Sequence, residues 1–209
     1  MDGDNCQFHN MYLRNAGASA TNYTALKLHA GENFYAANCQ FVGHAAATQV
    51  DTAATSSLWL YSDANGKPWG ATFDRCRIGS ASETIRTAGS TIYCSGAAAL
   101  TEKYCTFNDC TIESYSDTAA NPALHIAEGF AGDRYFLFKN CLFYNFSVNH
   151  AQAATEVIDD DSGSTHEVIL MNCAAMGYSS WDSAGIGYVY HVRGADAAGY
   201  GLMEVASSG

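Results

Sequence analysis

The sequence contains little proline, little charge and few basic residues. Of its 209 residues, two are Pro and 15% are charged, and 10 Lys and Arg against 21 Asp and Glu give a net charge of −11. Such an acidic surface repels phosphate backbones, and no local cluster of basic residues offsets it. We therefore expect no nucleic-acid partner.

Long apolar runs are also absent. No run approaches the ~18 residues that a transmembrane helix requires, so we expect no membrane partner. Residues 1–6 do not place an apolar stretch behind a basic region, as a secretory signal would. We therefore expect a chain that is made in the cytoplasm or cut from a longer protein.

The chain does contain the material of a packed core. Hydrophobic residues make up 48% and aromatic residues 12%, with 19 Gly, which is unlike a disordered tail or a low-complexity stalk. This length suits one domain, which we expect to span residues 1–209. The eight cysteines are only about 4% of the chain, below the density of a disulfide scaffold.

Six of these cysteines recur at intervals of about 31 to 37 residues in similar sequence contexts. They are Cys6, Cys39, Cys76, Cys110, Cys141 and Cys173. The residues before them are Asn5, Asn38, Arg75, Asp109, Asn140 and Asn172. Three residues ahead of the last five cysteines lie Ala36, Phe73, Phe107, Phe138 and Leu170. A repeat of this length is typical of a solenoid.

Short alternating apolar segments run in step with the cysteines. They are Leu26-Lys27-Leu28, Leu58-Trp59-Leu60, Ile92-Tyr93-Cys94, Leu124-His125-Ile126, Val157-Ile158 and Val189-Tyr190. Alternation indicates strands with one buried face, and no segment has a convincing helical period. A unit of ~32 residues cannot bury its apolar face alone, so copies must stack. The sequence predicts an all-β parallel β-helix of about six coils, with its last coil and C-terminal strand from about residue 177.

The residue before each repeated cysteine fits a sharp bend. Asn and Asp tolerate the left-handed conformation, and their side chains can bond to one another along the stack. Arg75 interrupts this ladder, which predicts a different turn in the third coil. The ladder cysteines are expected to be buried, reduced thiols, because aligned side chains aim poorly for a disulfide and no CxxC spacing suggests a metal.

The repeated unit and segments such as Gly31-Glu32-Asn33-Phe34-Tyr35 resemble right-handed parallel β-helix proteins of the pectate-lyase-like superfamily. Within that superfamily, the resemblance is to β-helical proteins of tailed-phage virions. It implies a right-handed coil and a virion component assembled in the host cytoplasm. Because such scaffolds host many functions, the role has to be argued from sites.

The same resemblance implies what a catalytic site would look like. β-Helical lyases hold Ca²⁺ with carboxylates beside a base, and glycoside hydrolases need two carboxylates roughly 5 to 9.5 Å apart. The candidates are Glu113 with Asp117, and Asp74 with Asp109 of the neighbouring coil. Asp74 and Asp109 do not share a position relative to their cysteines, which weakens the second pair.

The densest acidic run is the candidate metal site. Asp159, Asp160 and Asp161 precede a Gly and could bind Ca²⁺, but their spacing does not match an EF-hand loop. We therefore expect a flexible, solvated acidic loop and no cofactor, and a Ca²⁺ site at these residues is the alternative.

Two further groups have both a binding and a structural interpretation. Arg75 and Arg77 lie beside Asp74 and could steer an anionic sugar or form ordinary surface ion pairs. Trp59, Trp69 and Trp181, with thirteen Tyr, could form a sugar-stacking face. They could equally pack loops or fill a subunit interface.

The repeat begins at residue 5, which leaves nothing to cap the first coil, so we expect that coil to dock on another subunit, another protein or a missing domain. The leading hypothesis is a non-enzymatic virion structural protein, either capsid-decorating or fibre-like. We expect it to form a homotrimer and to contact other virion proteins and host glycans. The alternative is a carbohydrate-active module of tailspike type, either a polysaccharide lyase or a glycoside hydrolase.

Overall fold

The computed structural model is built from short β-strands that stack in parallel. It describes residues 2–17, 24–44, 55–63, 66, 68–80, 89–96, 101–115, 121–146, 154–161, 167–182, 188–192 and 203–204. Within these ranges every regular element is a strand, and no helix could cross a membrane. The all-β prediction and the ~32-residue repeat of a parallel β-helix are confirmed.

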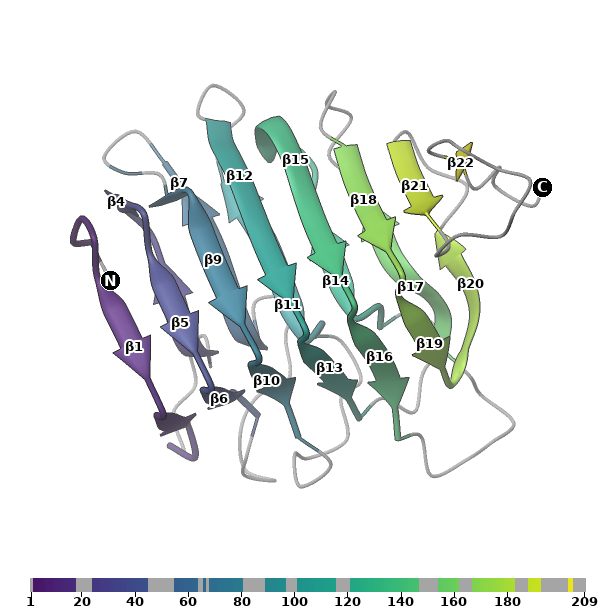
Figure 1. Cartoon of the computed structure of the whole chain (residues 1–209), viewed down its shortest axis with the longest axis horizontal. Coiled ribbons are helices and arrows are strands. Elements are labelled where there is room, and N and C mark those ends of the chain that lie inside the picture. The colour runs from purple at the N-terminus through teal and green to yellow at the C-terminus, as the bar shows by residue number, and fades with distance from the viewer. Residues whose placement is uncertain are drawn as a thin grey trace.

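Three long sheets form the walls of the β-helix, and Figure 1 shows the strands of the first sheet side by side. The first sheet contains β1 (Gln7–His9), β5 (Tyr35–Ala37), β9 (Ala71–Asp74), β12 (Thr101–Asn108), β15 (Ala131–Lys139), β18 (Glu167–Met171), β21 (Tyr188–Val192) and β22 (Met203–Glu204). The second contains β2 (Tyr12–Arg14), β6 (Gln40–Val42), β10 (Arg77–Gly79), β13 (Thr111–Ser114), β16 (Leu142–Asn145) and β19 (Ala174–Met176). The third contains β3 (Thr24–Leu28), β7 (Ser56–Ser62), β11 (Ile92–Gly96), β14 (Leu124–Ile126), β17 (Ala154–Asp160) and β20 (Tyr178–Asp182). A small fourth sheet pairs β4 (Gly31–Glu32) with β8 (Pro68–Trp69).

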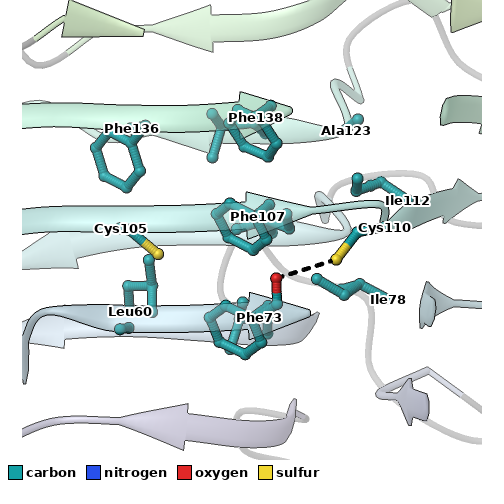
Figure 2. Packing of buried hydrophobic residues seen from close by; sticks show 14 of the residues in the cluster. Leu60, Phe73, Ile78, Cys105, Phe107, Cys110, Ile112, Ala123, Phe136 and Phe138 are labelled. Carbon is teal, nitrogen blue, oxygen red and sulfur yellow. Dashed lines mark hydrogen bonds between the residues drawn. The ribbon is translucent and has the colours of Figure 1, made fainter. Parts of the chain in front are cut away.

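The core is a set of ladders in which equivalent side chains of successive coils lie on one another. In the first sheet Ala36, Phe73, Phe107, Phe138 and Leu170 are in register, as the spacing ahead of the cysteines predicts. The rings of Phe73 and Phe107 lie on one another (Figure 2), and their centroids are 4.9 Å apart with planes inclined by 7°. Because strands stack at about 4.8 Å, flat rings on adjacent coils meet at van der Waals contact.

Four of the five ladder cysteines are buried at the junction of the first and second sheets, and Cys173 in the last of these coils is partly exposed. Cys39, Cys76, Cys110 and Cys141 are each at most 2% exposed, and all eight cysteines are free thiols. The Cys110 thiol donates a weak hydrogen bond to the Phe73 carbonyl at 3.5 Å (Figure 2). Burial raises the pKa of Cys39, so this thiol stays protonated and packs as a small apolar side chain.

The corner before each ladder cysteine has a left-handed backbone. Asn38, Arg75, Asp109, Asn140 and Asn172 have φ between 50° and 54°. Their side chains form a ladder along the stack: Asn172 Nδ2 donates to Asn140 Oδ1, and Asn140 Nδ2 donates to Asp109 Oδ1, each at 2.9 Å. The bend and the side-chain ladder are as the sequence predicts.

The prediction that Arg75 changes the turn of its coil is wrong. Arg75 adopts φ 50°, and its Nε donates to Asn38 Oδ1 at 3.1 Å. Its backbone N–H donates to the Asn108 carbonyl, so the strand ladder runs through the corner without interruption. The Arg75 guanidinium donates the hydrogen bond that an Asn side-chain amide donates in other coils. Arg75 adopts the same left-handed backbone, at some cost in conformational energy.

The assignment of Asn5 and Cys6 to this ladder is also wrong. Asn33 Nδ2 donates to Asn5 Oδ1 at 3.3 Å, which places Asn5 and Cys6 at a different, earlier corner. The first coil reaches the ladder position at Asn10, with φ 55°, and Met11 takes the place of the cysteine. Asn5-Cys6 resembles the ladder pairs only in sequence. More than one corner of the coil favours a left-handed Asn, so the same residue type occurs at both.

The last coil differs from the predicted spacing. Val189 and Tyr190 do not continue the third sheet; they lie in β21, which pairs with β18 in the first sheet. The third sheet ends instead at β20, which follows β19 across the single residue Gly177, with φ 80°. This coil has no insertion at that corner, so its strands arrive earlier than the period predicts. Finally, β22 pairs with β21 in the antiparallel direction.

Candidate functional site

Glu113, the first candidate catalytic carboxylate, is held in an ion pair. It lies on β13 and is 4% exposed, and Arg77 on the neighbouring β10 donates to both of its oxygens at 2.7 and 2.8 Å. A fork of this kind fixes the carboxylate and balances its charge. Its proposed partner Asp117 lies outside the described residues.

Asp74, the second candidate, is also engaged. It ends β9, accepts a hydrogen bond from the Tyr35 hydroxyl at 3.1 Å and pairs with Arg75 Nη1 at 2.8 Å. Burial and this hydrogen bond raise the pKa of Tyr35, so the phenol remains the donor. Asp74 is in register with Asn108, not with Asp109, as the offset from the cysteines predicts. The carboxylates of Asp74 and Glu113 therefore both accept hydrogen bonds from neighbouring side chains, which is a structural role.

A shallow groove lies along the corner between the first and second sheets, with a volume of about 470 Å³. One wall is a ladder of outward residues on the second sheet: Tyr12, Gln40, Arg77 and Thr111 are in register. Arg75 contributes from the corner ladder, and the side chains of Arg75 and Arg77 are 56% and 50% exposed. The groove thus presents polar side chains from four successive coils.

The chemistry of this groove suits hydroxyl groups better than anions. The charges of Arg75 and Arg77 are balanced by Asp74 and Glu113, so no excess positive charge remains to steer an anionic sugar. Nη2 of Arg75 and Nη1 of Arg77 form no hydrogen bond with the described part of the chain, and can donate outward. Tyr12 is 57% exposed and offers a flat ring beside them.

Sequence reasoning identified the two arginines of this groove but missed the other residues of its wall. Gln40 and Thr111 each follow a ladder cysteine, as Arg77 does, so the repeat contained the signal. Tyr12 is the equivalent of Gln40 in the first coil. The sequence does not show this, because the Asn5-Cys6 pair resembles Asn38-Cys39 but lies at a different corner.

The three tryptophans do not form one face. Trp59 is 8% exposed on the outer side of the third sheet, with Lys27 Nζ 4.1 Å from its ring centroid. Trp181 packs edge-on against the core ring of Phe143 at 5.9 Å. Trp69 lies on β8 in the small fourth sheet. These positions support the packing interpretation over a shared sugar-stacking face.

The prediction of a solvated acidic loop is wrong for Asp159 and Asp160, which belong to a strand. Asp159 and Asp160 end β17, and Asp160 turns inward to 2% exposure, in register with Ile126. Asp159 and Asp161 point outward beside His125, and one ligand atom from each of these three residues lies within 4.8 Å of the others. This is the group of side chains in the described residues that could hold a metal ion, and His125 was not part of the prediction.

Comparison with protein-family models, with curated proteins and with solved structures finds no match to this chain. The parallel β-helix therefore rests on strand register and topology, and function has to be argued from the surfaces just described.

Proposed function

We propose that this chain is a non-enzymatic structural protein of a tailed-phage virion, a capsid-decorating or fibre-like component. It assembles as a homotrimer in the host cytoplasm, contacts other virion proteins and adheres to host glycans. The resemblance of its repeat to right-handed β-helices of the pectate-lyase-like superfamily supplies the family context. The observation that carries the proposal is an apolar patch on the second sheet.

This apolar patch consists of Leu142, Tyr144, Phe146 and Met176. The first three alternate along and just past β16 with buried Phe143, so they face outward. Met176 is 55% exposed, and the rings of Tyr144 and Phe146 meet edge to face at 4.0 Å. Exposed apolar patches that contain aromatic residues and Met are typical of subunit interfaces. Along a threefold axis, the patch of each copy meets those of the other two.

Adhesion is assigned to the groove on the same sheet, which lies over earlier coils than the apolar patch. The outward N–H groups of Arg75 and Arg77, the amide of Gln40 and the ring of Tyr12 match the alternating hydroxyl and C–H faces of a sugar. Because the groove has no excess positive charge, we expect neutral glycans to bind better than acidic ones.

The first test is the native mass of the purified chain by light scattering during size exclusion across a dilution series. The proposal predicts a species of about three times 22.3 kDa that persists on dilution. A well-behaved monomer at every concentration would overturn the assembly.

The alternative is a carbohydrate-active module, either a polysaccharide lyase or a glycoside hydrolase. Its candidate acid Glu113 is buried and bound by Arg77, which leaves the carboxylate no access to substrate without breaking the pair. Release of reducing ends or of unsaturated sugars from a polysaccharide panel, lost in Glu113→Gln, would favour this alternative over the structural role.

A further inference from the structure

The outer face of the third sheet carries a continuous ladder of polar and aromatic side chains. The residues in register are Lys27, Trp59, Tyr93, His125 and Asp159. The His125 ring lies 5.4 Å from the Tyr93 ring, which limits its orientation. Asp161 follows β17 directly, and its N–H donates to the Ile126 carbonyl at 2.9 Å, which brings its carboxylate beside His125.

Two carboxylates converge on a single nitrogen of His125. Nε2 lies 3.8 Å from Asp159 Oδ2 and 3.6 Å from Asp161 Oδ2. Both distances exceed those of an N–H···O hydrogen bond. This nitrogen is buried from solvent and forms no hydrogen bond with the residues that the structure describes. Since Nε2 carries at most one proton, it cannot donate good hydrogen bonds to both carboxylates, whereas a cation between them can bind all three groups.

A second His-Asp-Asp group in the same protein shows what an ordinary arrangement looks like. His29 binds one carboxylate with each ring nitrogen: Nδ1 lies 3.2 Å from Asp2 and Nε2 lies 2.9 Å from Asp63. These are hydrogen-bond distances, and each acceptor has its own nitrogen. The group at His125 contains the same residue types but has the spacing of ligands around a shared centre.

We propose that His125, Asp159 and Asp161 bind a divalent transition-metal ion of the Zn²⁺ and Co²⁺ type. Ligand atoms about 2.0–2.2 Å from a tetrahedral ion are about 3.3 Å from one another, so small side-chain movements complete the site. An imidazole ligand selects such ions over Ca²⁺, which takes oxygen ligands. Asp161 is 63% exposed, so the ion can enter from solvent and keep a position for water.

Asp160 takes no part in this site. Its side chain is buried on the opposite face of β17, so the consecutive acidic residues divide between the core and the surface. The alternative calcium interpretation treated Asp159, Asp160 and Asp161 as one cluster. Successive side chains of a strand point to opposite faces, so Asp160 is separated from Asp159. The register with the preceding coil places His125 beside Asp159.

The test is a Co²⁺ titration of the full chain under reducing conditions, followed by Zn²⁺ competition in calorimetry. We expect one equivalent to bind with the ligand-field bands of a nitrogen and oxygen site. His125→Ala and Asp161→Asn should each weaken binding by at least about tenfold, whereas the matched variant His29→Ala should bind as the parent does. Asp161→Asn lies at an exposed position, so it keeps the test valid if His125→Ala does not fold.

Each other outcome overturns the proposal. Absence of binding rules out the site directly. Thiolate-to-cobalt charge-transfer bands would place the ion on the cysteines. Loss of binding in His29→Ala would move the site to the other group. Ca²⁺ binding that His125→Ala leaves unchanged would return the site to the carboxylates alone.

Discussion

The rings of Phe107 and Phe138 stack face to face, with centroids 4.5 Å apart and planes inclined by only 3°. This separation is close to the strand spacing of about 4.8 Å, so the aromatic stack and the hydrogen-bonded backbone share one period. Phe107 also stacks on Phe73, and all three side chains are completely buried. The centre of this stack is therefore the place where truncation leaves the largest unfilled volume.

We expect Phe107→Ala to lower the free energy of unfolding by about 3–5 kcal/mol, because it removes buried ring contacts on both sides. Urea denaturation followed by circular dichroism measures this change. The control is Phe8→Ala, a partly buried ring on the first strand, which should cost less. Equal losses for the two variants would contradict a core centred on the ladder.

Arg75 provides a direct test of the left-handed corner. Arg75→Asn should be neutral or stabilising, because Asn tolerates φ near 50° and restores the common ladder residue. Arg75→Val should cost about 1–2 kcal/mol, because a β-branched side chain is strained there. Both variants lose the exposed contact to Asp74, so their difference in denaturation midpoint isolates the backbone. Identical midpoints would contradict this account.

The Arg77–Glu113 pair should be more than a surface ion pair. Arg77→Met leaves a buried carboxylate without its cation, and we expect a loss of about 1–3 kcal/mol, reduced from a fully buried pair because Arg77 is half-exposed. Arg77→Met with Glu113→Gln should recover part of it in a double-mutant cycle. Arg75→Met, which breaks the more exposed pair with Asp74, is the control and should cost no more than about 1 kcal/mol. A cycle without coupling would contradict the structural role of Glu113.

The apolar patch on the second sheet predicts where assembly is sensitive. Met176→Asp should convert the proposed trimer to monomer in light scattering, because it would bury an unpaired charge at the proposed interface. Met171→Asp is the matched control: Met171 is 37% exposed but lies on the first sheet. Dissociation by the control variant alone would place the interface on the first sheet.

The buried phenol of Tyr178 predicts a loss of stability in alkali. Burial raises the pKa of Tyr178, so the folded state keeps a proton that the unfolded chain releases above pH ~10. The folded state then binds more protons, and the free energy of unfolding falls by up to about 1.4 kcal/mol per pH unit as pH rises beyond that value.

Tyr178→Phe should make this slope shallower, since the raised pKa values of Tyr35 and Cys39 still contribute to it, whereas Tyr12→Phe, at an exposed position, should leave it unchanged. Denaturant midpoints measured between pH 9 and 11 test the difference. Parallel curves for the parent and Tyr178→Phe would contradict the assignment.

The repeat, the strands and most of the core can be predicted from the amino-acid sequence. A cysteine after a left-handed Asn, Asp or Arg, with an apolar residue three positions ahead, marks one corner in five coils. Few residues accept that backbone, and few fit that interior. The same local pattern wrongly places Cys6 in the ladder, because the corner of Asn5 and Asn33 also favours a left-handed Asn. It also led to the wrong expectation for Arg75, whose side chain replaces the missing amide.

The candidate sites, in contrast, depend on contacts between residues that are far apart in the sequence. His125 meets Asp159 because the two residues are in register on adjacent coils. Arg77 reaches Glu113, two residues beyond its register partner Thr111 on the neighbouring strand. Both contacts depend on coil length, which the insertions at the corners determine. The last coil illustrates the effect. Only Gly177 separates β19 from β20, so β20 and β21 begin earlier in the sequence than the repeat length predicts. Local residue preferences specify a strand and its inward face, whereas contacts on the outer face depend on how the whole coil closes.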